Sequence, residues 1–294
     1  MKYTFVSLGK MESFGYRLGG AGLGNILFPW ATALVYAKKH DLKILEDASH
    51  AHGAVYKGKP IGSFGDVSIF SMQGNKLCPS GEGGILLCDD EDMWETAVRL
   101  GHYERLVNLE SNNKYFAATG FGYKFRMAPM AAALAVSQLS RMDERNARRN
   151  ENCIYLSEKL VELGLEPFLA PENVTRVYFE FLVRYNEDET GLPISDLAHA
   201  LQAEGALVTA PRYPLLHQQP VFTRGVWSTI ARLPATTENP LHVYDPADLP
   251  VTTLGNGSML KLPAFPSATT DLLDQYADAF AKVLSHASEI PRAR

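Results

Sequence analysis

Cysteine is scarce in this chain, which contains three cysteines in 294 residues. Cys78, Cys88 and Cys153 show no C-x-x-C spacing, so the sequence indicates neither a disulfide framework nor a thiolate zinc site. We therefore expect no bound metal. Three isolated thiols suit a reducing compartment such as the cytoplasm.

Long hydrophobic runs and a concentration of positive charge are also missing. The first residues reach Lys10, Glu12 and Arg17 without an uninterrupted apolar stretch, so we expect neither a signal peptide nor a membrane span. The formal net charge is -5 at pH 7, and lysines and arginines are not massed on one stretch, which argues against a nucleic-acid partner. We expect a soluble cytoplasmic protein that binds acidic or neutral metabolites.

The sequence does contain short apolar runs that alternate with helix-compatible segments. We expect strands at residues 43–47, 66–71 and 84–88, with a helix beginning in the acidic run that starts at Asp89. Continuous apolar strands between helices indicate a sheet that is buried on both faces. A long helical stretch over residues 130–163 is interpreted as the connection between two domains.

The second half of the chain has the pattern of a smaller α+β domain. We expect a half-buried strand at 177–184, an amphipathic helix at 194–204, a strand at 258–262 and a last helix at 269–285 capped by Thr270. Residues 224–256 are rich in Pro, Thr and Asn and are expected to form a long surface loop.

Four segments between residues 46 and 84 stand out because their order and spacing are specific. They are EDASHAHGA at 46–54, GSFGD at 62–66, FSMQGNK at 70–76 and GEGG at 81–84. They resemble the DegT/DnrJ/StrS family of sugar aminotransferases, whose pattern is E-D-A-A-Q-A-H-G-A, G-x-x-G-D, F-S-x-x-x-x-K and G-E-G-G. Residues 122–132 and 212–220 resemble further segments of that family, so the resemblance extends over about residues 36–287.

The resemblance implies a fold, a cofactor and an activity. The fold is α/β: an incomplete fold-type-I large domain with a mainly parallel sheet, plus a smaller α+β C-terminal domain. We divide the chain into an atypical segment at 1–40, a partial cofactor-binding domain at 41–129, and a linking helix with the small domain at 130–294. The cofactor is pyridoxal 5'-phosphate (PLP). The activity is transfer of an amino group from an amino acid, typically glutamate or glutamine, to a keto-sugar or ketocyclitol.

The resemblance also assigns roles to single residues. Lys76 is the catalytic residue that holds PLP as a Schiff base and moves the substrate proton, and Asp47 pairs with the pyridine nitrogen. Ser71 donates to the phosphate. His50 replaces the usual glutamine, as in the branch that acts on ketocyclitols, and contacts the cofactor. Lys124 stands where many relatives place an asparagine that reaches the phosphate of the neighbouring subunit, which implies a homodimer.

Each assignment has an ordinary structural alternative. A lysine beside glycines is commonly a solvated surface charge, and this applies to Lys76 and Lys124 alike. Asp47 and Ser71 could cap turns, and His50 could be a neutral packed ring. His52 is interpreted as structural, because a metal pair with His50 lacks a third ligand nearby.

The N-terminal region departs from the family pattern. Only 45 residues precede Glu46, and they contain no G-[S/T]-x-A phosphate-binding motif, of which Ala31–Leu34 is a faint echo. Residues 22–31 instead resemble the start of fucosyltransferase-type glycosyltransferases, or form a Gly-rich turn before a packed helix. We hypothesise a fusion or internal deletion near residues 36–40. The alternative to an active aminotransferase is a non-catalytic remnant that dimerises or regulates a paralogue; a glycosyltransferase activity is disfavoured by the rest of the chain.

Overall fold

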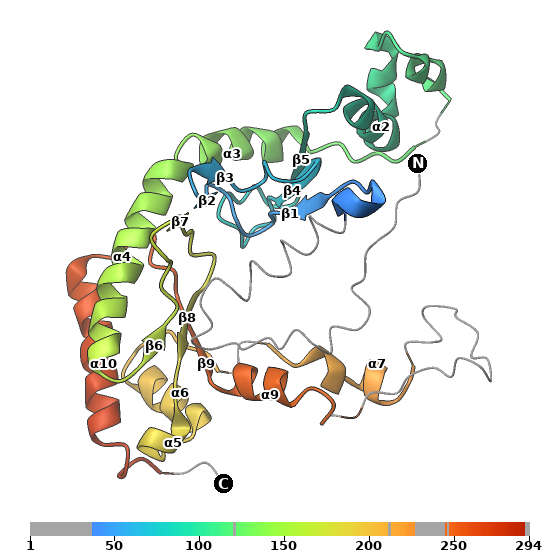
Figure 1. Ribbon diagram of the computed structural model, residues 1–294. Helices are drawn as coiled ribbons and strands as arrows, with labels where there is room; N and C mark the ends of the chain where they lie inside the picture. Colours follow the sequence, from blue (N-terminus) through green and yellow to red (C-terminus); the bar gives the residue numbers. More distant parts are fainter. Residues whose placement is uncertain (1–36, 120–121, 211–212, 227–244, 246, 292–294) are drawn as a thin grey trace. The chain divides into compact units, whose positions relative to one another are not determined.

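The computed structural model describes residues 37–119, 122–210, 213–226, 245 and 247–291 (Figure 1). These residues form two compact units, which we describe separately. Unit 1 contains residues 37–150 and 170–179, and unit 2 contains residues 151–169 and the described residues from 180 onward. The glycine-rich motif at 22–31 and the segment Ala31–Leu34 lie outside the described residues.

Unit 1 contains two small sheets. The first has the order β1-β4-β5, and the second has the order β3-β2-β7. The strands are β1 (Leu45–Asp47), β2 (Val55–Tyr56), β3 (Lys59–Pro60), β4 (Val67–Ser71), β5 (Gly84–Cys88) and β7 (Val174–Thr175). The pairing of β1 with β4 is parallel, whereas β4 with β5 and both pairings of the second sheet are antiparallel. The three strands expected in this region are confirmed, while a mainly parallel sheet stays a prediction.

The expected burial of this sheet on both faces is wrong for several of its apolar residues. Leu45 is 56% exposed, and Leu86 and Leu87 are 45% and 50% exposed. A buried apolar cluster of the unit forms instead where Met72 and Cys78 pack with Ala135 of helix α3 (Pro129–Leu139). An apolar run shows that a strand can be buried, but burial also needs a neighbour that covers each face.

In the helices of unit 1, the predicted start of α2 is correct, whereas the predicted length of the later helix is not. Helix α2 (Glu91–Gly101) begins in the acidic run as expected, and the Asp90 carboxylate accepts from Met93 N at 2.8 Å. It is followed by the 3-10 helices η1 (Tyr103–Asn108) and η2 (Asn112–Phe116). The single helix expected over 130–163 is wrong, because α3 ends at Leu139 and α4 (Met142–Glu162) begins after a break. Ser140 Oγ donates to the Ser137 carbonyl at this break, a local bond that competes with the helical ladder.

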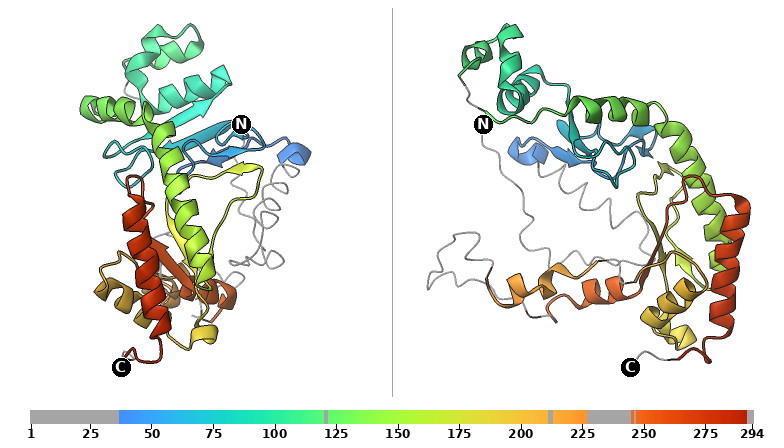
Figure 2. Two further views of the ribbon diagram at one scale, coloured as in Figure 1. Left: turned by 90° about the vertical axis from the view of Figure 1, so that its left-hand side faces the viewer. Right: turned by 180° about the vertical axis from the view of Figure 1, so that it is seen from behind.

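Unit 2 has an antiparallel sheet with helices around it, an α+β arrangement. Its strands, in the order β6-β8-β9, are β6 (Glu166–Pro167), β8 (Phe181–Arg184) and β9 (Met259–Leu262). Its helices are α5 (Glu187–Thr190), α6 (Ile194–Ala203), η3 (Leu216–Gln218), α7 (Pro220–Thr223), α9 (Pro250–Gly257) and α10 (Thr270–Ser285). Helix α10 lies beside residues 151–162 of α4 in both views of Figure 2, and Tyr155 donates to Asp274 at 2.7 Å.

Three boundaries in unit 2 differ from the expectation. The strand expected at 177–184 pairs only from Phe181 onward. Helix α10 is capped by Thr269 rather than Thr270, because the Thr269 hydroxyl accepts from Leu272 N. Helix α9 occupies the end of the expected loop at 224–256, where Pro250 supplies the favoured first position of a helix.

Among the described residues, every helix is too short or too polar to cross a bilayer.

Candidate active site

The motif carboxylate Glu46 explains why the first two sequence segments occur together. Its oxygens accept from three backbone amides of the second segment: Gly62 N at 2.7 Å, Phe64 N at 3.0 Å and Gly65 N at 3.2 Å. An ionised acceptor with three amide donors is a strong local anchor. Glu46 therefore fixes the loop that leads into β4.

Asp66 and Gly65 complete this junction between β1 and β4. The Asp66 carboxylate accepts from Ile44 N at 2.8 Å and from Lys43 Nζ at 3.3 Å. A Cβ atom at Gly65 would lie 2.9 Å from the Ile44 carbonyl oxygen and 3.2 Å from that of Val67, so glycine is required. The junction sets the parallel register in which Asp47 and Ser71 come at the same end of the two strands.

Asp47 ends β1 and is held as an anion. Its Oδ1 accepts from Ser49 N at 3.0 Å and from the Ser49 hydroxyl. The hydroxyl bond is the largest cause that lowers the pKa of Asp47, followed by the Ser49 amide, while the positive charges of His50 and Lys76 lower it further. The turn-capping alternative is thus realised in the structure, and Asp47 also lies within the electrostatic reach of two other predicted site residues.

Lys76 and His50 meet directly, together with an aromatic ring from a distant segment. Lys76 Nζ lies 2.6 Å from His50 Nε2 and 4.7 Å from the centre of the Phe179 ring. The rings of His50 and Phe179 stack with their centres 3.9 Å apart and their planes 13° apart. Lys76 is therefore not a free surface charge but part of an amine, imidazole and phenyl cluster.

A tight turn after β4 brings Lys76 to this position. Met72 N donates to the Gly83 carbonyl at 2.9 Å, and Lys76 N donates to the Gln73 carbonyl at 2.9 Å. Ser71 Oγ accepts from Gln73 N at 3.4 Å, which is the loop-capping alternative for Ser71. The turn places Ser71 and Lys76 on successive parts of one compact loop.

Lys124 lies in the segment that follows η2. Its backbone forms a β-bridge with His102, and the neighbouring Phe125 N donates to the Gly101 carbonyl at 2.8 Å. These bonds hold the segment against the end of α2. The Lys124 side chain is exposed.

Comparison with known proteins now decides the family. The model of the DegT/DnrJ/EryC1/StrS aminotransferase family matches residues 28–280 of this chain. The chain belongs to this family.

Its relatives within the DegT/DnrJ/EryC1/StrS family include enzymes that act on ketocyclitols. An L-glutamine:scyllo-inosose aminotransferase from Streptomyces griseus is 34% identical over 270 residues, which are 87% of this chain and 62% of that protein. An L-glutamine:2-deoxy-scyllo-inosose aminotransferase from Micromonospora echinospora is 31% identical over 86% of this chain and 61% of that protein. The chain thus spans a little over three fifths of the length of these relatives.

Solved structures of aminotransferases and related proteins are similar to this chain in fold. The structure of S. venezuelae DesV in complex with a ketimine intermediate superposes with a TM-score of 0.65 at 26% identity, and covers 87% of this chain and 61% of DesV. The aminotransferase from Psychrobacter cryohalolentis gives a TM-score of 0.67 at 22% identity over 87% of this chain and 65% of that protein. The α/β fold expected from the family motifs is therefore confirmed at the level of the fold type.

His52 agrees with its structural interpretation. It is 4% exposed and lies against Phe70, with ring centres 5.1 Å apart. Burial is the largest cause that lowers the pKa of His52. Within the described part of the chain, no group of three or more His, Cys, Asp and Glu side chains could hold a metal ion.

Phe179 is the site residue that sequence reasoning missed. It was expected only as one apolar position of the strand at 177–184, and its local pattern contains no sign of a partner near His50. The signal that could have found it is the histidine that replaces glutamine at position 50, because an imidazole invites an aromatic stacking partner. Family membership alone does not reveal this pairing.

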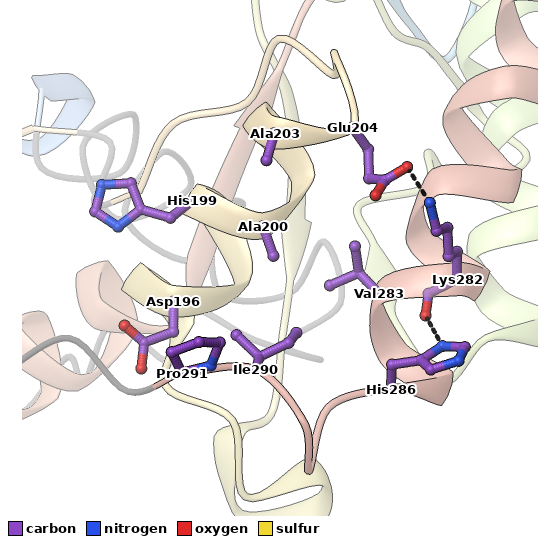
Figure 3. A pocket seen from close by; sticks show the side chains of 10 residues that line it. All are labelled: Asp196, His199, Ala200, Ala203, Glu204, Lys282, Val283, His286, Ile290 and Pro291. Atoms are coloured by element: carbon purple, nitrogen blue, oxygen red, sulfur yellow. Dashed lines mark hydrogen bonds and ion pairs between the residues drawn. The ribbon is translucent and has the colours of Figure 1, made fainter.

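A separate hollow of about 520 Å³ lies in unit 2, where α6 faces α10 and the residues after it (Figure 3). Lys282 Nζ pairs with Glu204 at 2.7 Å on its rim, and His286 Nδ1 lies 2.9 Å from the Lys282 carbonyl oxygen. Asp196 and His199 complete the polar part of the lining, which is otherwise mainly apolar. None of the residues predicted from the family motifs lines this hollow.

Proposed function

We propose that this chain carries the cofactor-binding part of a PLP-dependent aminotransferase that transfers an amino group from an amino acid to a keto-sugar or ketocyclitol. The observation that carries the proposal is the convergence of Lys76, His50 and Phe179, within electrostatic reach of the Asp47 anion. We place the cofactor-binding part at residues 41–129 and the linking helix with the small domain at 130–294.

The chemistry of these side chains fits PLP. The cofactor, when bound, acts as an electron sink that stabilises negative charge at the substrate carbon. A primary amine is needed to attach it, an anion to keep its ring nitrogen protonated, and flat groups to lie along its ring. Lys76 offers the amine, Asp47 the anion, and His50 with Phe179 the flat rings.

Each residue then has a definite task in amino transfer. Lys76 Nζ would hold the cofactor through its primary amine, and the same amine would be the base that takes and returns the proton of the reacting carbon. When the His50 ring is neutral with its proton on Nδ1, its Nε2, at 2.6 Å, can accept a hydrogen bond from Lys76 Nζ and orient the amine. The Ser49 hydrogen bonds keep Asp47 negative and aligned, so that its charge persists at neutral pH.

We also propose that the phosphate is bound by Ser71 and, from a second copy of the chain, by Lys124. Ser71 closes the strand from which the Lys76 turn begins, and its hydroxyl is a suitable donor. Lys124 is exposed on a segment fixed by backbone bonds to α2, as a residue that reaches a neighbouring subunit must be. The functional unit in this proposal is a cytoplasmic homodimer.

The acceptor class rests on the relatives and on His50. Proteins named as L-glutamine aminotransferases for scyllo-inosose and 2-deoxy-scyllo-inosose are 34% and 31% identical to this chain. We propose glutamine as the amino donor and a ketocyclitol or keto-sugar as the acceptor. The alternative of a non-catalytic remnant has no support among these relatives, which are named as enzymes.

The decisive experiment is an amino-transfer assay. Purified protein is supplied with PLP, L-glutamine labelled with nitrogen-15 in its α-amino group, and scyllo-inosose, and the labelled amino product is measured by mass spectrometry. We expect a labelled aminocyclitol from the unaltered chain and from Lys57→Ala, and none from Lys76→Ala. Lys57 is a matched control, because it is an exposed lysine of the same unit whose ammonium lies over Tyr56. Absence of product with scyllo-inosose and with a panel of nucleotide-linked keto-sugars would overturn the proposal.

A further inference from the structure

Asn146 of helix α4 binds the loop that carries His50. Its side-chain Nδ2 donates to the His52 carbonyl at 2.8 Å, and it is only 7% exposed. Its Oδ1 in turn accepts from Arg149 Nη1 at 2.8 Å, which fixes the orientation of the amide. The loop passes very close to the helix here, since a Cβ atom at Gly53 would lie 2.8 Å from Asn146 Nδ2.

Asn150, one turn further along α4, binds the segment that carries Phe179. Its Nδ2 donates to the Arg176 carbonyl at 2.6 Å. The same segment is tied to the motif region by the pairing of β7 with β2 and by the bond from Lys57 N to the Asn173 carbonyl at 2.8 Å. Two residues separate Arg176 from Phe179, so the Asn150 bond holds the backbone close to the stacked ring.

The two asparagines share one face of one helix. Residues four positions apart lie above one another on an α-helix, so both amides point to the same side of α4. One amide holds the backbone that leads from His50, and the other holds the backbone that leads to Phe179. Helix α4 therefore sets the distance between two segments that are far apart in sequence.

We propose that Asn146 and Asn150 are positioning residues that bring the His50 and Phe179 rings into their stack and thereby place Lys76 Nζ. The link to catalysis rests on the function proposed above, whereas the link to the stack does not. Each side-chain amide donates a hydrogen bond to a backbone carbonyl, and packing alone does not supply that bond. Loss of either bond lets one ring move while the strands and helices remain.

The test observes the stack itself, in protein freed of cofactor. A ring stacked 3.9 Å from Phe179 has proton resonances shifted by the phenyl ring current. His50→Gln identifies the His50 resonances in spectra of histidine-labelled protein, and Phe179→Leu defines their position without the stack. We expect Asn146→Ala and Asn150→Ala each to move the His50 resonances most of the way to the Phe179→Leu position.

A double variant and a matched control separate positioning from general stability. In the Phe179→Leu background, adding Asn150→Ala should shift the His50 resonances no further, because Asn150 acts through Phe179. Asn152 is the control, since it is on the same helix and its Nδ2 donates to the carbonyls of Phe265 and Ala268 in unit 2. Asn152→Ala should leave the His50 resonances in place even where it lowers the unfolding temperature.

Two results would overturn the inference. One is a folded Asn146→Ala or Asn150→Ala protein whose His50 resonances stay at the position found in the unaltered chain. The other needs no variant: side-chain amide protons of Asn146 and Asn150 that show no nuclear Overhauser contact with residues 52–53 and 176–177.

If both amides hold the stack and the protein nevertheless takes up no PLP, the proposed function fails and the positioning role stands. If PLP is taken up, each alanine variant should raise the half-saturating PLP concentration about fivefold.

Discussion

At the residue scale, Asp47 depends on its neighbour Ser49. The Ser49 hydroxyl and amide both bind Asp47 Oδ1 and are the largest causes that lower its pKa. The stability that these bonds contribute is present above the unfolded-state pKa, about 3.9, and is lost as pH falls through the lower folded-state pKa. Asp47 is therefore an anion throughout the pH range in which aminotransferases are assayed.

We predict that Asp47→Asn lowers amino-transfer turnover by about a hundredfold or more, since a preorganised charge at the reacting group is lost.

Ser49→Ala should retain activity near pH 7 but lose bound PLP at a higher pH than the unaltered chain on acidification. PLP absorbance measured from pH 6 down to pH 3 checks this. Asp89→Asn, an exposed carboxylate of unit 1, is the control. Equal acid curves for Ser49→Ala and the unaltered chain would contradict the assigned cause.

His52 gives a second prediction at this scale. Burial lowers its pKa in the folded state, so the unfolded state binds the proton more readily as pH falls through about 6.5. The free energy of unfolding should therefore decrease between pH 7.5 and pH 5.5. Urea denaturation at the two pH values should show a smaller decrease for His52→Gln. The exposed His199 serves as the control, and an equal effect of His199→Gln would refute this explanation.

Site residues that lie close together in the sequence could be predicted, whereas residues that contact them from distant positions could not. Lys76, Asp47 and His50 lie in one stretch of motif, and their order along the chain was enough to predict that they come together. Phe179 and the two asparagines of α4 contact this stretch from distant positions, and nothing in their local sequence marks the contact. Ser71 and Lys124 are placed on suitable elements, and their phosphate-binding roles stay predictions.

At the scale of elements, the Glu46 carboxylate is the acceptor that binds the most backbone amides at the junction between β1 and β4. The Glu46 carboxylate accepts hydrogen bonds from three backbone amides of the loop at 62–65. A glutamine side chain at this position would point its own NH2 group, which is a donor, at some of these backbone donors. The loop would then contain half-buried amides without an acceptor, which is costly. Loss of this carboxylate should loosen the register that places Asp47 and Ser71.

We predict that Glu46→Gln lowers the free energy of unfolding by about 2–3 kcal/mol, since hydrogen bonds to an ionised acceptor are lost. The matched control is Glu166→Gln, which removes an exposed ion pair with Arg184 in unit 2. That change should cost ~0.5 kcal/mol, as exposed pairs usually do. Urea denaturation of the three proteins measures both values. Equal losses for the two variants would show that the Glu46 anchor is unimportant.

Element boundaries were harder to predict than element types. The acidic start of helix α2 and the apolar strands β4 and β5 follow local rules, and all three were predicted. The break between α3 and α4 coincides with a local bond of Ser140, a residue that helices tolerate, so composition alone predicted one long helix. The exposure of Leu45 depends on what covers the sheet, which a strand pattern does not encode.

At the scale of the molecule, the family and the proposed activity rest on different observations. A match over residues 28–280 establishes the family, and the solved relatives establish the fold type. The proposed activity rests on how residues within unit 1 meet around Lys76. The fold class could be predicted because ordered motifs identify a family, whereas the division into domains stays a prediction.

Attachment of PLP to Lys76 is the claim on which the proposed function depends. The most direct measurement is borohydride reduction of the protein after incubation with PLP, followed by mass spectrometry of its peptides. We expect a yellow protein in which the reduced cofactor is found on the peptide that contains Lys76, and its loss in Lys76→Ala but not in Lys57→Ala. A colourless protein, or cofactor spread over several exposed lysines without preference for Lys76, would contradict it.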